Sequence, residues 1–397
     1  MKFSKRIDKI RASMTLSIEA KARELKEKGE DVIGFGAGEP DFPTPEHVKN
    51  AGIEAIRQNQ TRYTPVAGTN ELKDAIAAKL KRENGLSYQR NQIVVSCGAK
   101  QSFYNLAQVL WEEGDEVIVP APYWVSYPEM IILSGAKPVI VNTTADCEFK
   151  ITPEQLEKVV TPNTRALIIN SPSNPTGSAY TRAELERLAE FSLKHGLLII
   201  SDEIYEKIVF DGFSPVSIAA LSPEVQKNCV VINGMSKSYA MTGWRIGYLA
   251  GDAKIADQVT KLQSQMTSNP ASISQAASIA ALNGSQDAIH AMVQEFQKRR
   301  NGLVDRLRGI AGVTCYKPVG SFYAFPDFSR FYGKRFGGKI ITGSLALAEY
   351  LLTETKVAIV PGIAFGADAH ARLSFASSME NLNRGMERIS TALNELK

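Results

Sequence analysis

Cysteine and histidine are both scarce in this chain, with four of each among 397 residues. The cysteines stand far apart and form no Cys-x-x-Cys pair, so the sequence predicts reduced thiols and no disulfide framework. No histidines have the His-Glu-x-x-His spacing of zinc hydrolases. Zinc chemistry and a histidine-based triad are therefore not expected, and no metal is predicted.

Long hydrophobic runs are also missing. No apolar stretch approaches the roughly 18 residues of a membrane helix, so no membrane partner is expected. Residues 1–8 carry basic charge but no apolar segment, unlike a secretory signal. Lysine and arginine are interleaved with acidic residues at a net charge of +4, which gives no basic stripe for nucleic acid. We expect a cytoplasmic protein.

The chain does have ample material for a core, being 44% hydrophobic and 22% charged, which suits one large or two ordinary domains. Short apolar runs alternate with helical segments and end in polar or glycine-rich turns. This rhythm predicts an α/β fold with a mainly parallel sheet flanked by helices. The predicted strands begin at Ile93, Glu116, Ala166, Leu197 and Cys229.

Helices are predicted over residues 14–28 and about 288–308, and the second of these is expected to lead into a smaller α/β domain. Residues 331–344 are basic and glycine-rich and are predicted to form a mobile surface loop. The expected division is a large domain of residues 47–285 and a small domain built from both chain ends, 1–46 and 286–397.

Residues able to bind a ligand stand at or just past the predicted strand ends: Gly98, Trp124, Asn174, Asp202 and Lys237. Ligands of open α/β sheets bind outside the carboxyl ends of the strands. These residues are far apart in sequence, yet such a sheet would bring them to one edge, which packing alone does not explain.

Two of these residues point to particular chemistry. Lys237 lies among small and apolar residues, where lost hydration favours the neutral amine that attacks a carbonyl. Asp202 closes a buried apolar strand, where a carboxylate is costly without a cationic partner. Taken singly, a surface lysine and a helix-capping acid remain the alternatives.

Three further stretches suit anions or aromatic ligands. Gly98 and Ala99 lie between a strand and a helix, where free N–H groups and the helix dipole make an anion seat. Arg372 alternates with apolar neighbours and has the planar fork that grips a carboxylate. Tyr63 follows Arg62 in a loop, and taken alone it is as well explained by packing.

The stretch from Ser236 to Gly247 resembles the lysine motif of fold-type I pyridoxal-phosphate aminotransferases, Ser-Lys-x-Tyr-x-Met-x-Gly-x-Arg-x-Gly. The resemblance extends over nearly the whole chain and is nearest to the prokaryotic subgroup Ib of aspartate aminotransferases. It implies transamination between L-aspartate and 2-oxoglutarate, giving oxaloacetate and L-glutamate, in a homodimer with shared active sites.

The resemblance also implies pyridoxal 5′-phosphate as the cofactor. Lys237 would hold it covalently and then move the proton between Cα and C4′. Asp202 would pair with the ring nitrogen, Asn174 and Tyr205 would contact the phenolate oxygen, and Trp124 would stack on the ring. The residues implied at or near the cofactor phosphate are Gly98, Ala99, Lys100, Ser236, Arg245 and Tyr63 of the partner subunit.

For the substrate, the resemblance places Arg372 at the α-carboxylate, with Gly38 beside it, and Lys100 at the distal carboxylate. Trp124 and Asn174 would border the substrate as well. Some members of the subgroup accept prephenate, whose distal carboxylate would meet Lys100, Arg11 or Thr15.

Two departures from the family pattern bear on substrate preference. The usual Pro-Ser-Ala-Thr is Ala-Ser-Met-Thr at residues 12–15, and Ser96-Cys97 replaces a threonine and a small residue. The alternatives that stay open are transamination of prephenate or aromatic amino acids, a lyase or synthase of the same fold, and a non-enzymatic pyridoxal-phosphate-binding regulator.

Overall fold

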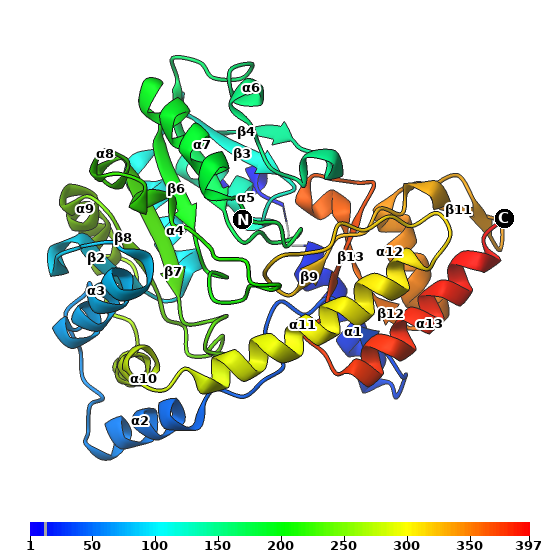
Figure 1. Cartoon of the computed structure of the whole chain (residues 1–397), viewed down its shortest axis with the longest axis horizontal. Coiled ribbons are helices and arrows are strands. Elements are labelled where there is room, and N and C mark those ends of the chain that lie inside the picture. The colour runs from blue at the N-terminus through cyan, green and yellow to red at the C-terminus, as the bar shows by residue number, and fades with distance from the viewer. Residues whose placement is uncertain (12–13) are drawn as a thin grey trace.

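The computed structural model describes residues 1–11 and 14–397, without the side chains of residues 15 and 16. Its centre is a seven-stranded sheet (Figure 1). In spatial order the strands are β2 (Ile93–Ser96), β8 (Gly247–Ala250), β7 (Cys229–Gly234), β6 (Leu198–Asp202), β5 (Thr164–Asn170), β3 (Glu116–Ala121) and β4 (Lys137–Asn142). Only β8 runs antiparallel to its neighbours. The prediction of a mixed, mainly parallel sheet is therefore confirmed.

The sheet is covered on both faces because side chains along each strand alternate between two apolar layers. In β7, Val230 and Ile232 belong to one layer and Val231 belongs to the other. The first layer contains residues of α4 (Ala99–Leu110), α5 (Ser126–Ser134) and α9 (Ala253–Ser264). The second contains residues of α3 (Asn70–Asn84), α7 (Arg182–Lys194) and α10 (Ser272–Asn283).

Helix α2 (Glu46–Arg57) packs on α10 and projects from the body of the molecule (Figure 1). No helix in the described part of the chain is long and apolar enough to cross a membrane. The short helices are α6 (Pro153–Leu156), α8 (Pro223–Lys227), η1 (Ile7–Lys9), η2 (Arg90–Gln92), η3 (Ala145–Cys147), η4 (Ile218–Ala220), η5 (Ser329–Phe331) and η6 (Gly362–Phe365).

A second lobe lies beside the sheet and contains the C-terminus, whereas the first residues of the chain lie near α5 of the large lobe (Figure 1). Strand β1 (Ile33–Gly34) pairs in parallel with β12 (Val357–Ala358). A three-stranded antiparallel sheet joins β13 (Val360–Pro361), β14 (Ala371–Ser374) and β9 (Tyr323–Ala324). Its helices are α1 (Met14–Glu27), α11 (Asp287–Arg308), α12 (Ser344–Thr355) and α13 (Met379–Glu395). On the β1–β12 pairing we propose domain boundaries at residues 46/47 and 285/286.

Helices α1 and α11 match the predicted helices at residues 14–28 and 288–308. The predicted surface loop at 331–344 is more ordered than expected, because β10 (Arg335–Phe336) and β11 (Lys339–Ile340) form an antiparallel hairpin there. Gly337 and Gly338 supply the positive φ angles of its turn. The Arg335 N–H donates to the Lys397 carbonyl at 2.7 Å, so the hairpin is tied to the end of the chain.

Candidate active site

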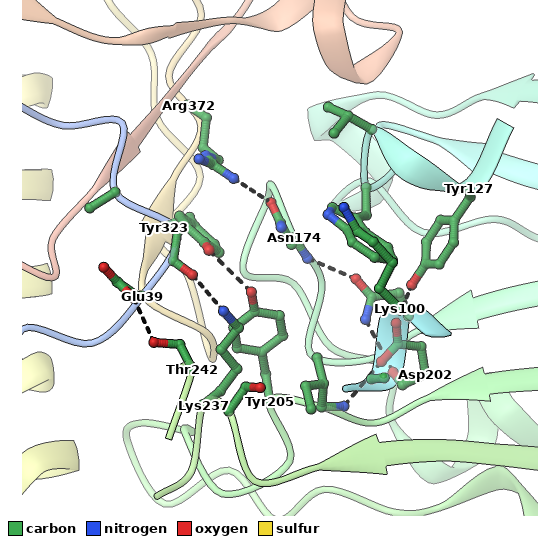
Figure 2. Close-up of a pocket in the computed structure, with 18 of the residues that line it drawn as sticks. Glu39, Lys100, Tyr127, Asn174, Asp202, Tyr205, Lys237, Thr242, Tyr323 and Arg372 are labelled. Atoms are coloured by element: carbon green, nitrogen blue, oxygen red, sulfur yellow. Dashed lines mark hydrogen bonds between the residues drawn. The ribbon is translucent and has the colours of Figure 1, made fainter. Parts of the chain in front are cut away.

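A cavity of about 540 Å³ lies between the carboxyl edge of the large sheet and the second lobe (Figure 2). Strand register explains why distant residues meet there, since Asn170 pairs with Asp202, and Asp202 with Ile232, at adjacent strand ends. The lining residues are Glu19, Ala37, Gly38, Glu39, Ala99, Lys100, Trp124, Val125, Tyr127, Asn170, Asn174, Asp202, Ile204, Tyr205, Ser236, Lys237, Thr242, Arg245, Tyr323 and Arg372.

Lys237 follows the end of β7 and extends into the cavity (Figure 2). Its Nζ donates to the Gly38 carbonyl at 2.5 Å. Burial first, and then the charges of Arg372 and Arg245, lower the pKa of the Lys237 amine to about 8, while Glu39 and Asp202 oppose the shift. The neutral fraction of this amine therefore rises as the pH passes through about 8, near the working range of a nucleophilic lysine.

The lysine loop returns to the sheet at Gly247, whose backbone lies directly against the start of α4. A Cβ at Gly247 would overlap the Ala99 backbone, so only glycine permits this approach. The Met235 N–H donates to the Ile246 carbonyl at 3.1 Å, which closes the loop at its base. The sequence thereby fixes Lys237 beside the N-terminus of α4.

An anion seat is built where these segments meet. Gly98 has φ of 88°, and a Cβ at this position would overlap the Arg245 guanidinium. Arg245 donates to the Thr242 carbonyl at 2.8 Å and to the Cys97 carbonyl at 3.1 Å. The first N–H groups of α4, the exposed Arg245 and the Ser236 hydroxyl thus surround one end of the cavity, as a phosphate requires.

Asp202 also lines the cavity and is only 5% exposed. The Tyr127 hydroxyl donates to its Oδ2, and the Ile204 N–H donates to its Oδ1 at 3.2 Å. Burial raises the pKa of the Asp202 carboxyl to about 6, against the lowering effect of both hydrogen bonds and of Lys237. The carboxylate is therefore ionised near neutral pH and suited to pairing with a cation.

Arg372 is 4% exposed and anchors the second-lobe side of the cavity. Its guanidinium donates to Asn174 Oδ1 at 3.0 Å and to the Gly36 carbonyl at 2.8 Å, and it lies 4.3 Å from the Tyr323 ring centroid. Within the described part of the chain, Arg372 Nε is buried without a hydrogen-bond partner. An unmet buried donor on an arginine facing a cavity fits a carboxylate ligand.

Tyr205 and Tyr323 place their hydroxyls 3.1 Å apart, so Tyr205 is held by a residue of the second lobe. Lys100 stands at the exposed rim, with its Nζ 5.1 Å from the Trp124 ring centroid. Desolvation, and then Arg245, lower the pKa of the Lys100 amine. The site thus combines a cationic rim with a flat aromatic wall.

Most of the residues predicted for the site lie together, but three need separate description. Tyr63 is 92% exposed and lies in a different surface hollow of the same protomer. Arg11 is exposed and donates its N–H to Glu129 Oε2 at 2.9 Å, outside the cavity lining. Thr15 belongs to α1, but its side chain is not among the described parts of the structure. Residues 12 and 13 lie outside the described residues altogether.

Sequence reasoning missed several lining residues, among them Glu19, Thr242, Tyr127 and Tyr323. Tyr127 could have been suspected, because it follows Trp124 by only three residues and lies in the first turn of α5. Glu19 and Tyr323 come from the second lobe, and no local pattern marks them.

The donor set fits pyridoxal 5′-phosphate. The anion seat suits its phosphate, the buried Asp202 suits a protonated ring nitrogen, and the amine of Lys237 lies in the same cavity. The buried Arg372 Nε leaves a carboxylate position beside this space.

Comparison with known proteins agrees with this geometry. A family model described as aminotransferase class I and II matches residues 30–389. The chain is 51% identical to an aspartate aminotransferase of Geobacillus stearothermophilus, covering 98% of both chains. It is 47% identical to an aspartate/prephenate aminotransferase of Nitrosomonas europaea, covering 99% of this chain and 100% of that one.

Among solved structures, an aspartate aminotransferase from Rhizobium meliloti superposes with a TM-score of 0.97 at 44% identity, covering 100% of both chains. An aspartate aminotransferase from Thermus thermophilus with maleate gives a TM-score of 0.92 at 40% identity, covering 99% of this chain and 100% of that one. These likenesses confirm the fold-type I architecture. The chain belongs to the aminotransferase class I and II family, whose members depend on pyridoxal phosphate.

Proposed function

We propose that this enzyme transfers the amino group of L-aspartate to 2-oxoglutarate, giving oxaloacetate and L-glutamate. The observation that carries the proposal is the meeting of Lys237, Asp202 and Arg372 in one cavity, although they come from three separate stretches of the chain. The aspartate aminotransferases similar over their whole length support the choice of substrate.

The residues present divide the work of holding the cofactor, which when bound supplies a carbonyl for the amino group and an electron-accepting ring. Ser236, Arg245 and the start of α4 at Gly98 and Ala99 would hold the phosphate. Asp202 holds the ring nitrogen in its protonated form, and Asn174 and Tyr205 stabilise the phenolate oxygen. Trp124 covers one face of the ring.

Lys237 performs the proton transfer. Its Nζ would act as a base that takes the proton from the substrate Cα. It would then act as an acid that delivers the proton to C4′ of the cofactor. The depressed pKa of about 8 keeps this amine within reach of both protonation states near neutral pH. The Gly38 carbonyl, 2.5 Å from Nζ, holds the amine on the substrate side of the cavity.

A dicarboxylic substrate needs two cationic partners. Arg372 presents a planar fork for the α-carboxylate, fixed by Asn174 and Gly36. Lys100 stands on a flexible stem at the rim and can follow the distal carboxylate of substrates of different length. Gly38 and Trp124 border the same space.

Lys100→Ala should raise KM for aspartate and 2-oxoglutarate far more than KM for alanine or phenylalanine. The expected loss in kcat/KM is about 2–3 kcal/mol, the size of one charge-assisted hydrogen bond. Steady-state kinetics with each donor measure this difference.

Arg372→Lys is the matched comparison, because it should weaken every amino acid alike. Equal losses for aspartate and phenylalanine in Lys100→Ala would assign Lys100 to the phosphate or the fold, and the second carboxylate would then belong to Arg11 or another residue.

We further propose a homodimer in which Tyr63 of the partner subunit reaches the cofactor phosphate. Tyr63 is almost fully exposed on its own protomer and lies away from that protomer's cavity. Exposed apolar side chains of α2, Ile53 and Ile56, lie on the projecting helix nearby in sequence. Exposed apolar surface of this kind suits an interface between copies.

Mixing a Lys237→Ala variant with a Tyr63→Ala variant should restore activity through hybrid dimers. Each hybrid contains one site with both residues intact, so random exchange should recover about a quarter of the wild-type activity. The rate is measured after subunit exchange has been verified with two differently tagged chains. No recovery after verified exchange would argue against a shared site.

A second candidate function is transamination of prephenate or aromatic amino acids, favoured by the aspartate/prephenate aminotransferase of N. europaea at 47% identity. Rates for a panel of amino donors with 2-oxoglutarate test both functions. Aspartate should give the highest kcat/KM. If phenylalanine exceeded aspartate as the donor, or if prephenate exceeded 2-oxoglutarate as the acceptor of the amino group of aspartate, the second function would replace the first. Cofactor binding without turnover of any donor would indicate a regulator.

We also propose that the protein works in the reducing cytoplasm. Its four cysteines are free thiols, and Cys229 and Cys315 are buried. Burial raises the pKa of the Cys315 thiol to about 12, and it raises that of Cys229 well above the usual value. Unpaired thiols of this kind are typical of reducing compartments.

A further inference from the structure

Tyr127 contacts two walls of the cavity at once. It lies in the first turn of α5, and its hydroxyl donates to Asp202 Oδ2 at the end of β6 (Figure 2). Tyr127 is 2% exposed and Asp202 is 5% exposed, so water scarcely competes for this hydrogen bond. A buried carboxylate depends on such donors, because each one replaces hydration that the charge has lost.

The ring of Tyr127 is fixed by aromatic neighbours. It meets the Trp124 ring edge-on, with centroids 5.1 Å apart at 87°, and it lies 5.0 Å from the Phe103 ring. The Tyr127 N–H donates to the Trp124 carbonyl at 3.0 Å. With its ring packed on both sides, the tyrosine cannot turn its hydroxyl away from Asp202 without disturbing Trp124.

Three titratable side chains face Asp202, and each comes from a different part of the fold. Tyr127 faces it from α5, Tyr205 from the turn after β6, and Lys237 from the loop after β7. Burial raises the pKa of the Tyr127 hydroxyl well above its usual value, as does the nearby Asp202 charge. The hydroxyl therefore keeps its proton and is a permanent donor, which holds the pKa of Asp202 down.

We propose that Tyr127 is a positioning residue, whose hydroxyl keeps Asp202 ionised and correctly oriented while its ring supports the Trp124 wall. The inference rests on the proposed function, because Asp202 serves the ring nitrogen only in its ionised form. Tyr127 would thus position both Asp202 and Trp124, and cofactor binding depends on both of these residues. The part played by the hydroxyl can be separated from that of the ring by a single substitution.

Tyr127→Phe removes the hydroxyl and keeps the ring. In the cofactor-free protein, the ¹³C resonance of the Asp202 carboxyl, assigned with Asp202→Asn, should titrate at a pH about one unit higher than in the wild type. The sign follows because losing a donor to the charged form raises the pKa. The affinity of the apoprotein for pyridoxal phosphate, followed by tryptophan fluorescence, should fall about fivefold at pH 6 and recover as the pH rises.

Tyr350→Phe is the matched control, since Tyr350 is also buried and donates to the Ala392 carbonyl at 2.9 Å in the second lobe. It should leave the Asp202 titration and the pH dependence of cofactor affinity unchanged. In the unsubstituted protein, the Tyr127 Cζ resonance should move as Asp202 titrates, which tests the contact even if Tyr127→Phe folds poorly.

The inference is overturned if Asp202 titrates at the same pH in Tyr127→Phe and wild type, or if the Tyr127 Cζ resonance ignores the Asp202 titration. Failure of the proposed function looks different, because the wild-type protein itself would then transaminate no donor. The carboxyl titration needs no cofactor and gives its answer in either case.

Discussion

Lys237→Ala should abolish nearly all transamination, with a fall of at least about 10⁴-fold in the amino-transfer step, the upper end of the range for a positioned general base. The physical reason is that Lys237 supplies the nucleophilic amine in the cavity and also carries the substrate Cα proton. Single-turnover absorbance with aspartate measures the loss. Borohydride reduction followed by peptide mapping should find no cofactor bound to residue 237.

The control for this prediction is Lys254→Ala, which removes an exposed lysine from the first turn of α9, outside the cavity. That variant should keep wild-type turnover and the borohydride-reducible linkage. Normal turnover with a reducible linkage in Lys237→Ala would show that another amine performs the chemistry and that the assignment of the lysine motif is wrong.

The sheet was predictable because its strands carry their own signals. Cys229 to Ile232 is β-branched and apolar, and β7 occupies this run with Val230 and Val231 on opposite faces. Burial on both faces of a parallel strand produces such runs, and the polar residue that ends each run marks the ligand edge. This rule places Asp202 at that edge, and Lys237 follows three residues after the end of β7.

The second lobe was harder to predict in detail, because its strands are short. β9 and β12 contain two residues each, too few to show a period. The contact between the Tyr205 and Tyr323 hydroxyls at 3.1 Å joins residues from different lobes, and only the packing of the lobes creates it. Glu19 reaches the cavity for the same reason.

The local pattern of the glycine-rich loop near the N-terminus predicts that it borders the active site. It does not predict which residues the loop contacts. Gly38 is predicted to lie beside the substrate carboxylate; it lines the cavity, and its carbonyl accepts from Lys237 Nζ. Farther along, Thr44 Oγ1 donates to the Ala240 carbonyl at 2.7 Å and accepts from Trp244 Nε1 at 3.1 Å. This loop therefore braces the lysine loop, a contact between distant segments that no spacing in the sequence predicts.

Burial and charge act against each other at Asp202, and a bound cation would favour the charged form. Burial raises the pKa of its carboxyl to about 6, although Tyr127 and Ile204 donate hydrogen bonds to it. Because the pKa is raised by burial, the ionised form is present above about pH 6 and is lost as the pH falls through that value. A protonated ring nitrogen beside the carboxylate would stabilise the ionised form and would in turn keep its own proton.

Asp202→Asn should slow the proton-transfer step by at least about 10²-fold, the scale for removing one preorganised electrostatic partner. Asparagine keeps the shape of the side chain but has no charge, so the ring nitrogen loses the partner that keeps it protonated. Single-turnover rates from pH 5 to 9 measure the effect. The loss of rate that we expect in the wild type as the pH falls and Asp202 takes up a proton should vanish in the variant. Asp252→Asn is the control, because Asp252 caps the N-terminus of α9 at an exposed position where asparagine caps equally well. Parent-like single-turnover rates in Asp202→Asn would remove Asp202 from the reaction and leave its buried hydrogen bonds with Tyr127 and Ile204 a purely structural role.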